Sequence, residues 1–72
     1  MEFETFGDFV RAVTGGRLAR GDVVYVSSTF YGRLSEAERG WLWRHALDAR
    51  LRLITDVEVG APIVVRRGAV DD

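Results

Sequence analysis

The chain has 72 residues, enough for one small domain that buries only about 60% of the surface its unfolded form exposes. Its 47% hydrophobic and 29% charged residues are typical of a globular protein, and a formal net charge of −1 gives no general attraction to nucleic acid or to an anionic membrane. The absence of cysteine and lysine excludes disulfides, thiolate metal ligands, thiol catalysis and Schiff-base chemistry.

The first predicted element is a short helix. Its apolar residues recur with helical spacing, and they are Phe6, Phe9, Val10 and Val13. Thr5 precedes this stripe as the expected N-cap, and the Gly15-Gly16 pair can end the helix because glycine adopts the left-handed cap conformation without strain. We expect Phe3, which lies ahead of the cap, to fold back on Val10 or on the sheet.

A turn and a buried strand come next. Residues 20–22 (Arg-Gly-Asp) match the integrin-binding tripeptide, but they lead directly into a strand, so we interpret them as a turn. Residues 23–29 begin with four β-branched or aromatic residues in succession, which is typical of a strand buried on both faces. Residues 30–32 (Phe-Tyr-Gly) are expected to form the loop into the next helix.

The second predicted helix has the clearest start signal in the chain. Ser35 and Glu38 have the spacing of a capping box, in which each side chain accepts a hydrogen bond from the other residue's backbone N–H. Gly40 is a mild weakness near the beginning of this helix. The helix should extend to about Arg50.

Two strands complete the chain. Residues 51–59 alternate between apolar and polar side chains, which is the period of a half-buried strand. Residues 60–62 (Gly-Ala-Pro) predict a turn, and residues 63–67 a last strand that forms a hairpin with the one before it. The organisation is therefore a single domain over residues 1–68, followed by a flexible acidic tail at 69–72.

The predicted fold class is α+β, with the element order α-β-α-β-β. We expect a three-stranded, mostly antiparallel sheet with two helices on one face. The expected core consists of apolar residues from each periodic segment: Phe6, Phe9, Val10, Val13, Val24, Val26, Leu42, Trp43, Ala46, Leu53, Val57, Ile63 and Val65.

The two tryptophans of the second helix cannot both be buried against one sheet. At 100° per residue, positions 41 and 43 differ by about 200° around the helix axis. Trp43 lies in the larger apolar arc, with Leu42 and Ala46, and is assigned to the core. Trp41 is then expected to face solvent, a loop or a partner, and tryptophan is among the residues most enriched at binding hot spots.

Catalytic and metal-binding residues are not predicted. His45 is the only histidine and shares a helix face with Glu38 and Asp48, a pattern more typical of a solvated surface than of a site. The serines have no flanking glycine motif, and the glycines form no phosphate-binding loop. We therefore expect a protein that is not an enzyme and that holds no cofactor and no metal.

By elimination, the sequence favours a small protein-binding module of regulatory, accessory or virus-encoded inhibitor type. It would bind a partner protein or its own copy through the Trp41 helix face or through a sheet edge. The expected partner-binding residues are Trp41, Phe30, Tyr31, Arg44 and His45. No apolar run approaches 18 residues and no charged-then-apolar start is present, so we expect a cytoplasmic protein without membrane contact.

Nucleic-acid binding is the alternative. Residues 37–70 contain six arginines against four acidic residues, and arginine suits phosphate and guanine recognition. The candidate patch on the second helix and the hairpin consists of Arg39, Arg44, Arg52, Arg66 and Arg67. Against this alternative, acidic residues are interleaved with these arginines, and the chain is too short between its helices to supply a helix-turn-helix.

Overall fold

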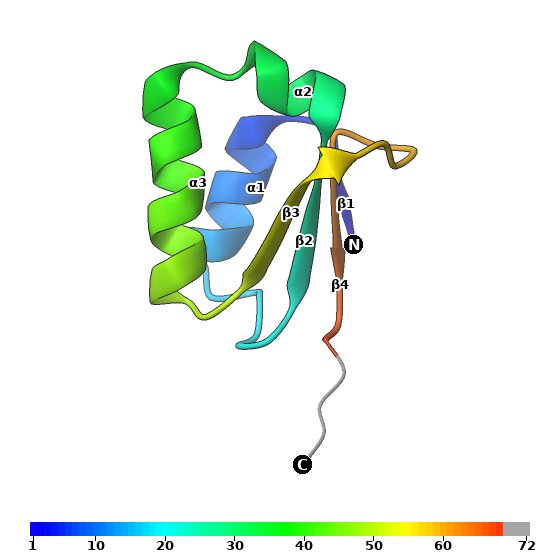
Figure 1. Cartoon of the computed structure of the whole chain (residues 1–72). Helices are drawn as coiled ribbons and strands as arrows, with labels where there is room; N and C mark the ends of the chain where they lie inside the picture. The colour runs from blue at the N-terminus through cyan, green and yellow to red at the C-terminus, as the bar shows by residue number, and fades with distance from the viewer. Residues whose placement is uncertain (69–72) are drawn as a thin grey trace.

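The computed structural model describes residues 1–68, which form a four-stranded mixed sheet and three helices (Figure 1). The elements in chain order are β1 (Glu2–Phe3), α1 (Phe6–Thr14), β2 (Val23–Ser27), α2 (Ser28–Arg33), α3 (Glu36–Asp48), β3 (Arg52–Val57) and β4 (Ile63–Arg66). The α+β class is thus confirmed, with one strand and one helix more than the sequence predicts. The expected acidic tail at 69–72 lies outside the described residues.

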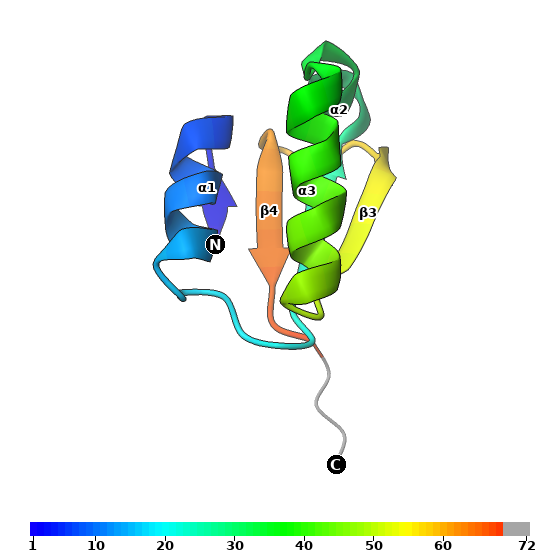
Figure 2. The same ribbon diagram turned by 90° about the vertical axis from the view of Figure 1, so that its left-hand side faces the viewer.

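Helices α1 and α3 lie side by side on one face of the sheet (Figures 1 and 2). Seen from the helix side, β4 is visible between them, and α3 lies nearer to β3 (Figure 2). Helix α2 follows β2 at one end of the sheet (Figure 1). Within residues 1–68 no helix covers the opposite sheet face, so the domain has two layers and one uncovered face.

The strand order is β1-β4-β2-β3, and it shows that the predicted hairpin between the last two strands is wrong. β4 pairs antiparallel with β1 and β2, whereas β3 pairs parallel with β2. The parallel pair arises because α3 is a crossover helix: it returns the chain to the end of the sheet at which β2 begins, so β3 runs in the same direction as β2. β4 is a central strand, which explains why Ile63, Val64 and Val65 are all buried.

The strand registers separate the two sheet faces. Val24 pairs with Leu53 and Val65, and Val26 pairs with Ile63; these residues face the helices. Two rows face away from the helices, namely Arg52, Val23 and Arg66 in one row and Ile54, Tyr25, Val64 and Glu2 in the next. We call this second surface the uncovered sheet face.

The core differs from the predicted one in identifiable ways. Its buried cluster is Phe3, Phe9, Ala12, Val24, Val26, Leu34, Leu42, Ile63 and Val65. Among the other predicted members, Ala46 is buried, Phe6, Val10, Val13, Leu53 and Val57 are half-buried, and Trp43 is exposed. Phe3 enters the core from β1, where its ring packs edge-on against Phe9 at 5.6 Å between centroids. A two-residue strand carries no periodic signal, so β1 could not be predicted as an element.

The Arg-Gly-Asp tripeptide is a turn, as predicted. Gly21 has φ of 92°, a conformation that favours glycine. The Asp22 side chain is buried, and its Oδ2 accepts a hydrogen bond from the Ala19 backbone N–H at 2.9 Å. This carboxylate therefore closes the turn that leads into β2.

The N-terminal caps of α1 and α3 are those that the sequence predicts. The Thr5 side chain accepts from the Asp8 N–H at the start of α1, and Ser35 and Glu38 form both hydrogen bonds of the capping box of α3. Helix α3 ends at Asp48, slightly earlier than expected. The Arg50 N–H donates to the Leu47 carbonyl and the Leu51 N–H to the Ala46 carbonyl, which is the Schellman pattern that terminates a helix.

The predicted loop at residues 30–32 belongs to α2, which Ser27 and Glu58 hold at its N-terminus. Glu58 Oε1 accepts from Ser27 Oγ at 2.7 Å, and Oε2 accepts from the Thr29 N–H at 3.0 Å and from Thr29 Oγ1 at 2.9 Å. These hydrogen bonds, that from Ser27 above all, lower the pKa of Glu58. The carboxylate thereby links the end of β3 to the first turn of α2.

Glu58→Gln is expected to lower the melting temperature at neutral pH, because the neutral amide replaces a charged acceptor of three hydrogen bonds. Since the folded-state pKa is depressed, the carboxylate's stabilisation is present above the unfolded pKa and is lost as the pH falls through the folded pKa. Melting curves recorded between neutral and acidic pH should therefore show that the difference in melting temperature between Glu58→Gln and the wild type becomes smaller below pH 4.5, the ordinary pKa of this carboxyl group. Glu4→Gln, at an exposed position, is the matched control, and a difference independent of pH would contradict this role.

Candidate functional site

The two tryptophans of α3 have opposite environments, and the predicted assignment is reversed. Trp41 is half-buried against α1, with its indole edge-on to Phe6 at 5.6 Å and to Phe9 at 6.3 Å between centroids. His45 stacks on the same indole at 4.0 Å with an interplanar angle of 17°. Trp43 instead keeps 47% of its surface exposed.

The reversal has a simple geometric cause. Leu42 and Ala46 face the sheet, and the two tryptophans lie about 100° to either side of Leu42 around the helix. The side that carries Trp41 faces α1 and is covered by its phenylalanines, whereas Trp43 on the other side contacts Tyr31 of α2. The sequence does not reveal on which side of α3 the first helix packs.

Trp43 is held by contacts with α2. Its Nε1 donates a hydrogen bond to Tyr31 Oη at 2.8 Å, and the Arg39 guanidinium lies over the Tyr31 ring at 5.5 Å from the centroid. Tyr31 is half-buried in this arrangement. The indole is thus oriented in the monomer while its outer surface remains open to solvent.

The exposed stripe of α3 is the candidate site, and we call it the outer face. It consists of Glu36, Gly40, Trp43 and Leu47, together with Arg50, which lies two residues beyond the end of the helix; all five are exposed. Leu47 keeps 79% of its surface in contact with solvent, one helical turn from Trp43. Among the described residues, the only other large hydrophobic side chain with this status is Met1. The outer face therefore concentrates the exposed apolar surface of the domain.

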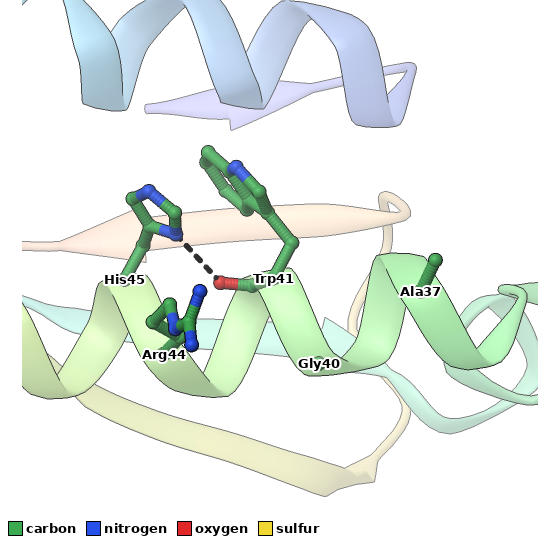
Figure 3. A pocket seen from close by; sticks show the side chains of 5 residues that line it. All are labelled: Ala37, Gly40, Trp41, Arg44 and His45. Atoms are coloured by element: carbon green, nitrogen blue, oxygen red, sulfur yellow. Dashed lines mark hydrogen bonds between the residues drawn. The ribbon is translucent and has the colours of Figure 1, made fainter.

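A shallow hollow of about 350 Å³ lies beside the outer face (Figure 3). Its lining residues are Ala37, Gly40, Trp41, Arg44 and His45. Trp41 and His45 point toward α1, and His45 Nδ1 donates to the Trp41 carbonyl oxygen at 3.0 Å (Figure 3). Because Ala37 and Gly40 have little or no side chain, the helix backbone is close to solvent here.

The expected partner-binding residues do not form one surface. Trp41, Arg44 and His45 line the hollow together. Tyr31 contacts Trp43 on the other side of α3, and Phe30 packs half-buried against the core. The sequence analysis did not identify Trp43 and Leu47 as exposed. A signal was present, because a helix with apolar side chains on two opposite sides can pack only one of those sides against the sheet.

The acidic residues near His45 do not gather around it. Glu38 Oε1 accepts the Ser35 N–H at 2.8 Å and is thereby engaged in the capping box. Asp48 is exposed at the last residue of α3. In the part of the chain that the structure describes, no three histidine, aspartate or glutamate side chains lie close enough to hold a metal ion.

The arginines of the alternative hypothesis lie on both layers of the domain. Arg39 and Arg44 belong to α3. Arg52 and Arg66 flank Val23 on the uncovered sheet face, where Arg66 lies over the Tyr25 ring at 5.7 Å. The five arginines therefore do not form one contiguous patch.

The uncovered sheet face carries a second hollow, of about 300 Å³. Tyr25, Val57, Glu58, Val59 and Arg66 line it. Two of its charged groups already have contacts within the domain, because Glu58 binds the start of α2 and the Arg66 guanidinium lies over the Tyr25 ring. This face is consequently a weaker candidate than the outer face of α3.

No protein-family model, curated protein or solved structure matches this chain. Function is therefore inferred from the geometry of the site. Of the helices within residues 1–68, none combines the length and apolar composition needed to cross a bilayer.

Proposed function

We propose that this chain is a small protein-binding module that docks through the outer face of α3. The observation that carries the proposal is the exposure of Trp43 and Leu47 on a helix that already buries Leu42 and Ala46 against the sheet. Fully burying a leucine side chain is worth about 1.5–3 kcal/mol, so leaving Leu47 in water forgoes a stabilisation that a partner can supply. Tryptophan is enriched at the energetic centres of interfaces.

The fixed orientation of Trp43 supports the same role. Its hydrogen bond to Tyr31 holds the indole in place before any partner arrives. A side chain that is already ordered loses less conformational entropy on binding than a freely rotating one, which otherwise costs about 0.5–1.5 kcal/mol. The Arg39 guanidinium over the Tyr31 ring extends this ordered surface along α3.

The other docking modes expected from the sequence have less support. The indole of Trp41 is already engaged with α1, so the Trp41 face offers mainly the shallow hollow. At the sheet edges, β1 has only two residues, and the β2–β3 register shifts between Tyr25 and Ser27. Short edge strands and β-bulges are features that discourage strand addition.

The test compares Leu47→Glu with the wild type in affinity purification from a lysate of the source organism, with and without nuclease treatment. A charge at this exposed position should leave folding intact and reduce partner recovery at least about 10-fold, because it would have to be desolvated in the complex. Ala19→Glu, on an exposed turn residue, is the matched control and should recover the partner like the wild type.

Two outcomes would contradict the proposal. Equal recovery with Leu47→Glu, measured by quantitative mass spectrometry, would show that the outer face is not the docking surface. Recovery that disappears with nuclease for every variant would favour the arginines and nucleic acid instead. Circular dichroism of each variant establishes that the comparison is made between folded proteins.

A further inference from the structure

We infer that the outer face binds a second copy of this chain, with the two α3 helices packed antiparallel across a two-fold axis. The inference rests on the proposed function and names its partner. It follows from three properties of the outer face, namely its spacing, its glycine and its charges.

The spacing of the outer face is that of a helix–helix seam. Its helical residues follow one another at intervals of four, three and four positions: Glu36, Gly40, Trp43 and Leu47. This alternation places one residue per turn along a single stripe, and it is the pattern by which two helices interdigitate their side chains. In an antiparallel pair centred between Trp43 and Leu47, each tryptophan packs against the leucine of the second copy.

Gly40 has no function within the monomer that its surroundings reveal. A Cβ atom added there would meet nothing within 4 Å, and the position is exposed in the interior of α3. Glycine inside a helix costs about 1 kcal/mol relative to alanine, so the monomer would be more stable without it. A glycine in the seam allows a second helix to approach closely, because no Cβ atom stands between the two backbones.

The charges at the two ends of the outer face select the antiparallel orientation and a second copy. Glu36 lies two turns before Trp43, and Arg50 lies just beyond the end of α3, seven residues after Trp43. In the antiparallel pair that places Trp43 opposite Leu47, Arg50 of each copy lies opposite Gly40 of the other, one helical turn from Glu36, so opposite charges approach each other twice. A parallel pair would instead place like charges together at both ends, which is unfavourable.

The contact is small, so the association should be weak. α3 has 13 residues and is therefore about 20 Å long. A helix pair of this length buries less than the roughly 1,200 Å² at which standard stable interfaces begin. We expect a dissociation constant in the micromolar range, about 10 µM.

Sedimentation velocity from about 5 to about 500 µM, a range that brackets this constant, tests the inference. The wild type should shift from monomer to dimer. Leu47→Glu, Glu36→Arg and Arg50→Glu should each weaken association at least about 10-fold, the charge variants because they place like charges together. An equimolar mixture of Glu36→Arg and Arg50→Glu should form dimers again, because opposite charges then meet at both ends.

Gly40→Arg provides a test that does not depend on the stability of the charge variants. Arginine is a better helix former than glycine, so the monomer should melt at a higher temperature, while the new side chain faces Arg50 of the second copy and weakens association. Gly32→Arg, at another helical glycine with nothing within 4 Å, is the matched control and should sediment like the wild type.

A wild type that stays monomeric throughout the range, or a dimer that none of these α3 substitutions affects, would overturn the inference. If the monomeric protein nevertheless captures a different protein that Leu47→Glu loses, self-association fails and the proposed function stands. If neither dimer nor such a partner exists, both fail.

Discussion

Trp41→Ala is expected to lower the free energy of unfolding by about 3 kcal/mol, because it removes a large aromatic group from a packed position. The indole connects α3 to α1 through Phe6 and Phe9, and His45 stacks on it. A domain of this size has a total stability of roughly 4–10 kcal/mol, so the loss is a substantial part of it. Urea denaturation monitored by circular dichroism measures the change.

Trp43→Ala is the matched control on the same helix. Because Trp43 is 47% exposed, its removal should cost only about 1 kcal/mol, chiefly through the hydrogen bond to Tyr31. The same variant should weaken association, whereas Trp41→Ala acts through folding. A larger loss of stability for Trp43→Ala than for Trp41→Ala would contradict the packing of α3 described above.

Leu42→Ala should destabilise the domain by about 3 kcal/mol, since it leaves a cavity beneath α3. Leu42 is among the largest fully buried side chains, with 2% of its surface exposed. Leu47→Ala makes the same chemical change five residues later at a position that is 79% exposed, and it should alter stability by no more than about 0.5 kcal/mol.

The pair of leucine variants separates the buried side of α3 from its outer face. Thermal melts at low protein concentration, where the chain is monomeric, provide the comparison. Similar losses for both variants would mean that Leu47 is buried in solution, and the outer face would then be occupied even in the isolated protein.

Local signals in the sequence predict the starts of α1 and α3. Thr5 and the Ser35–Glu38 capping box act within a few residues, so their hydrogen bonds do not depend on the rest of the fold. The same holds for the turn at residues 20–22, whose glycine has a positive φ. Residues that are neighbours in the sequence determine these features.

Features decided by distant parts of the chain could not be predicted in this way. Residues 63–66 have an apolar pattern that indicates a strand, but nothing in it identifies β1 and β2 as its neighbours. The α2 helix is held partly by Glu58, a residue 29 positions after Thr29 in the sequence. Its N-terminal contact therefore forms only when β3 is in place.

The candidate site illustrates the same limit. The helical wheel shows that one tryptophan must lie outside the core, but choosing between Trp41 and Trp43 requires the position of α1 relative to α3. On the helical wheel Leu47 lies close to Trp43, so assigning Trp43 to the core leaves Leu47 on the same buried side. Once Trp43 faces outward, the same proximity places Leu47 on the outer face.

Docking of the outer face of α3 onto a second copy of the chain would be visible residue by residue in two-dimensional ¹H–¹⁵N NMR spectra recorded over a dilution series. We expect concentration-dependent shifts along the outer face and at Tyr31, with Tyr25, Ile54 and Val64 on the uncovered sheet face unchanged. Spectra that do not change with concentration, or shifts confined to the uncovered sheet face, would contradict this docking.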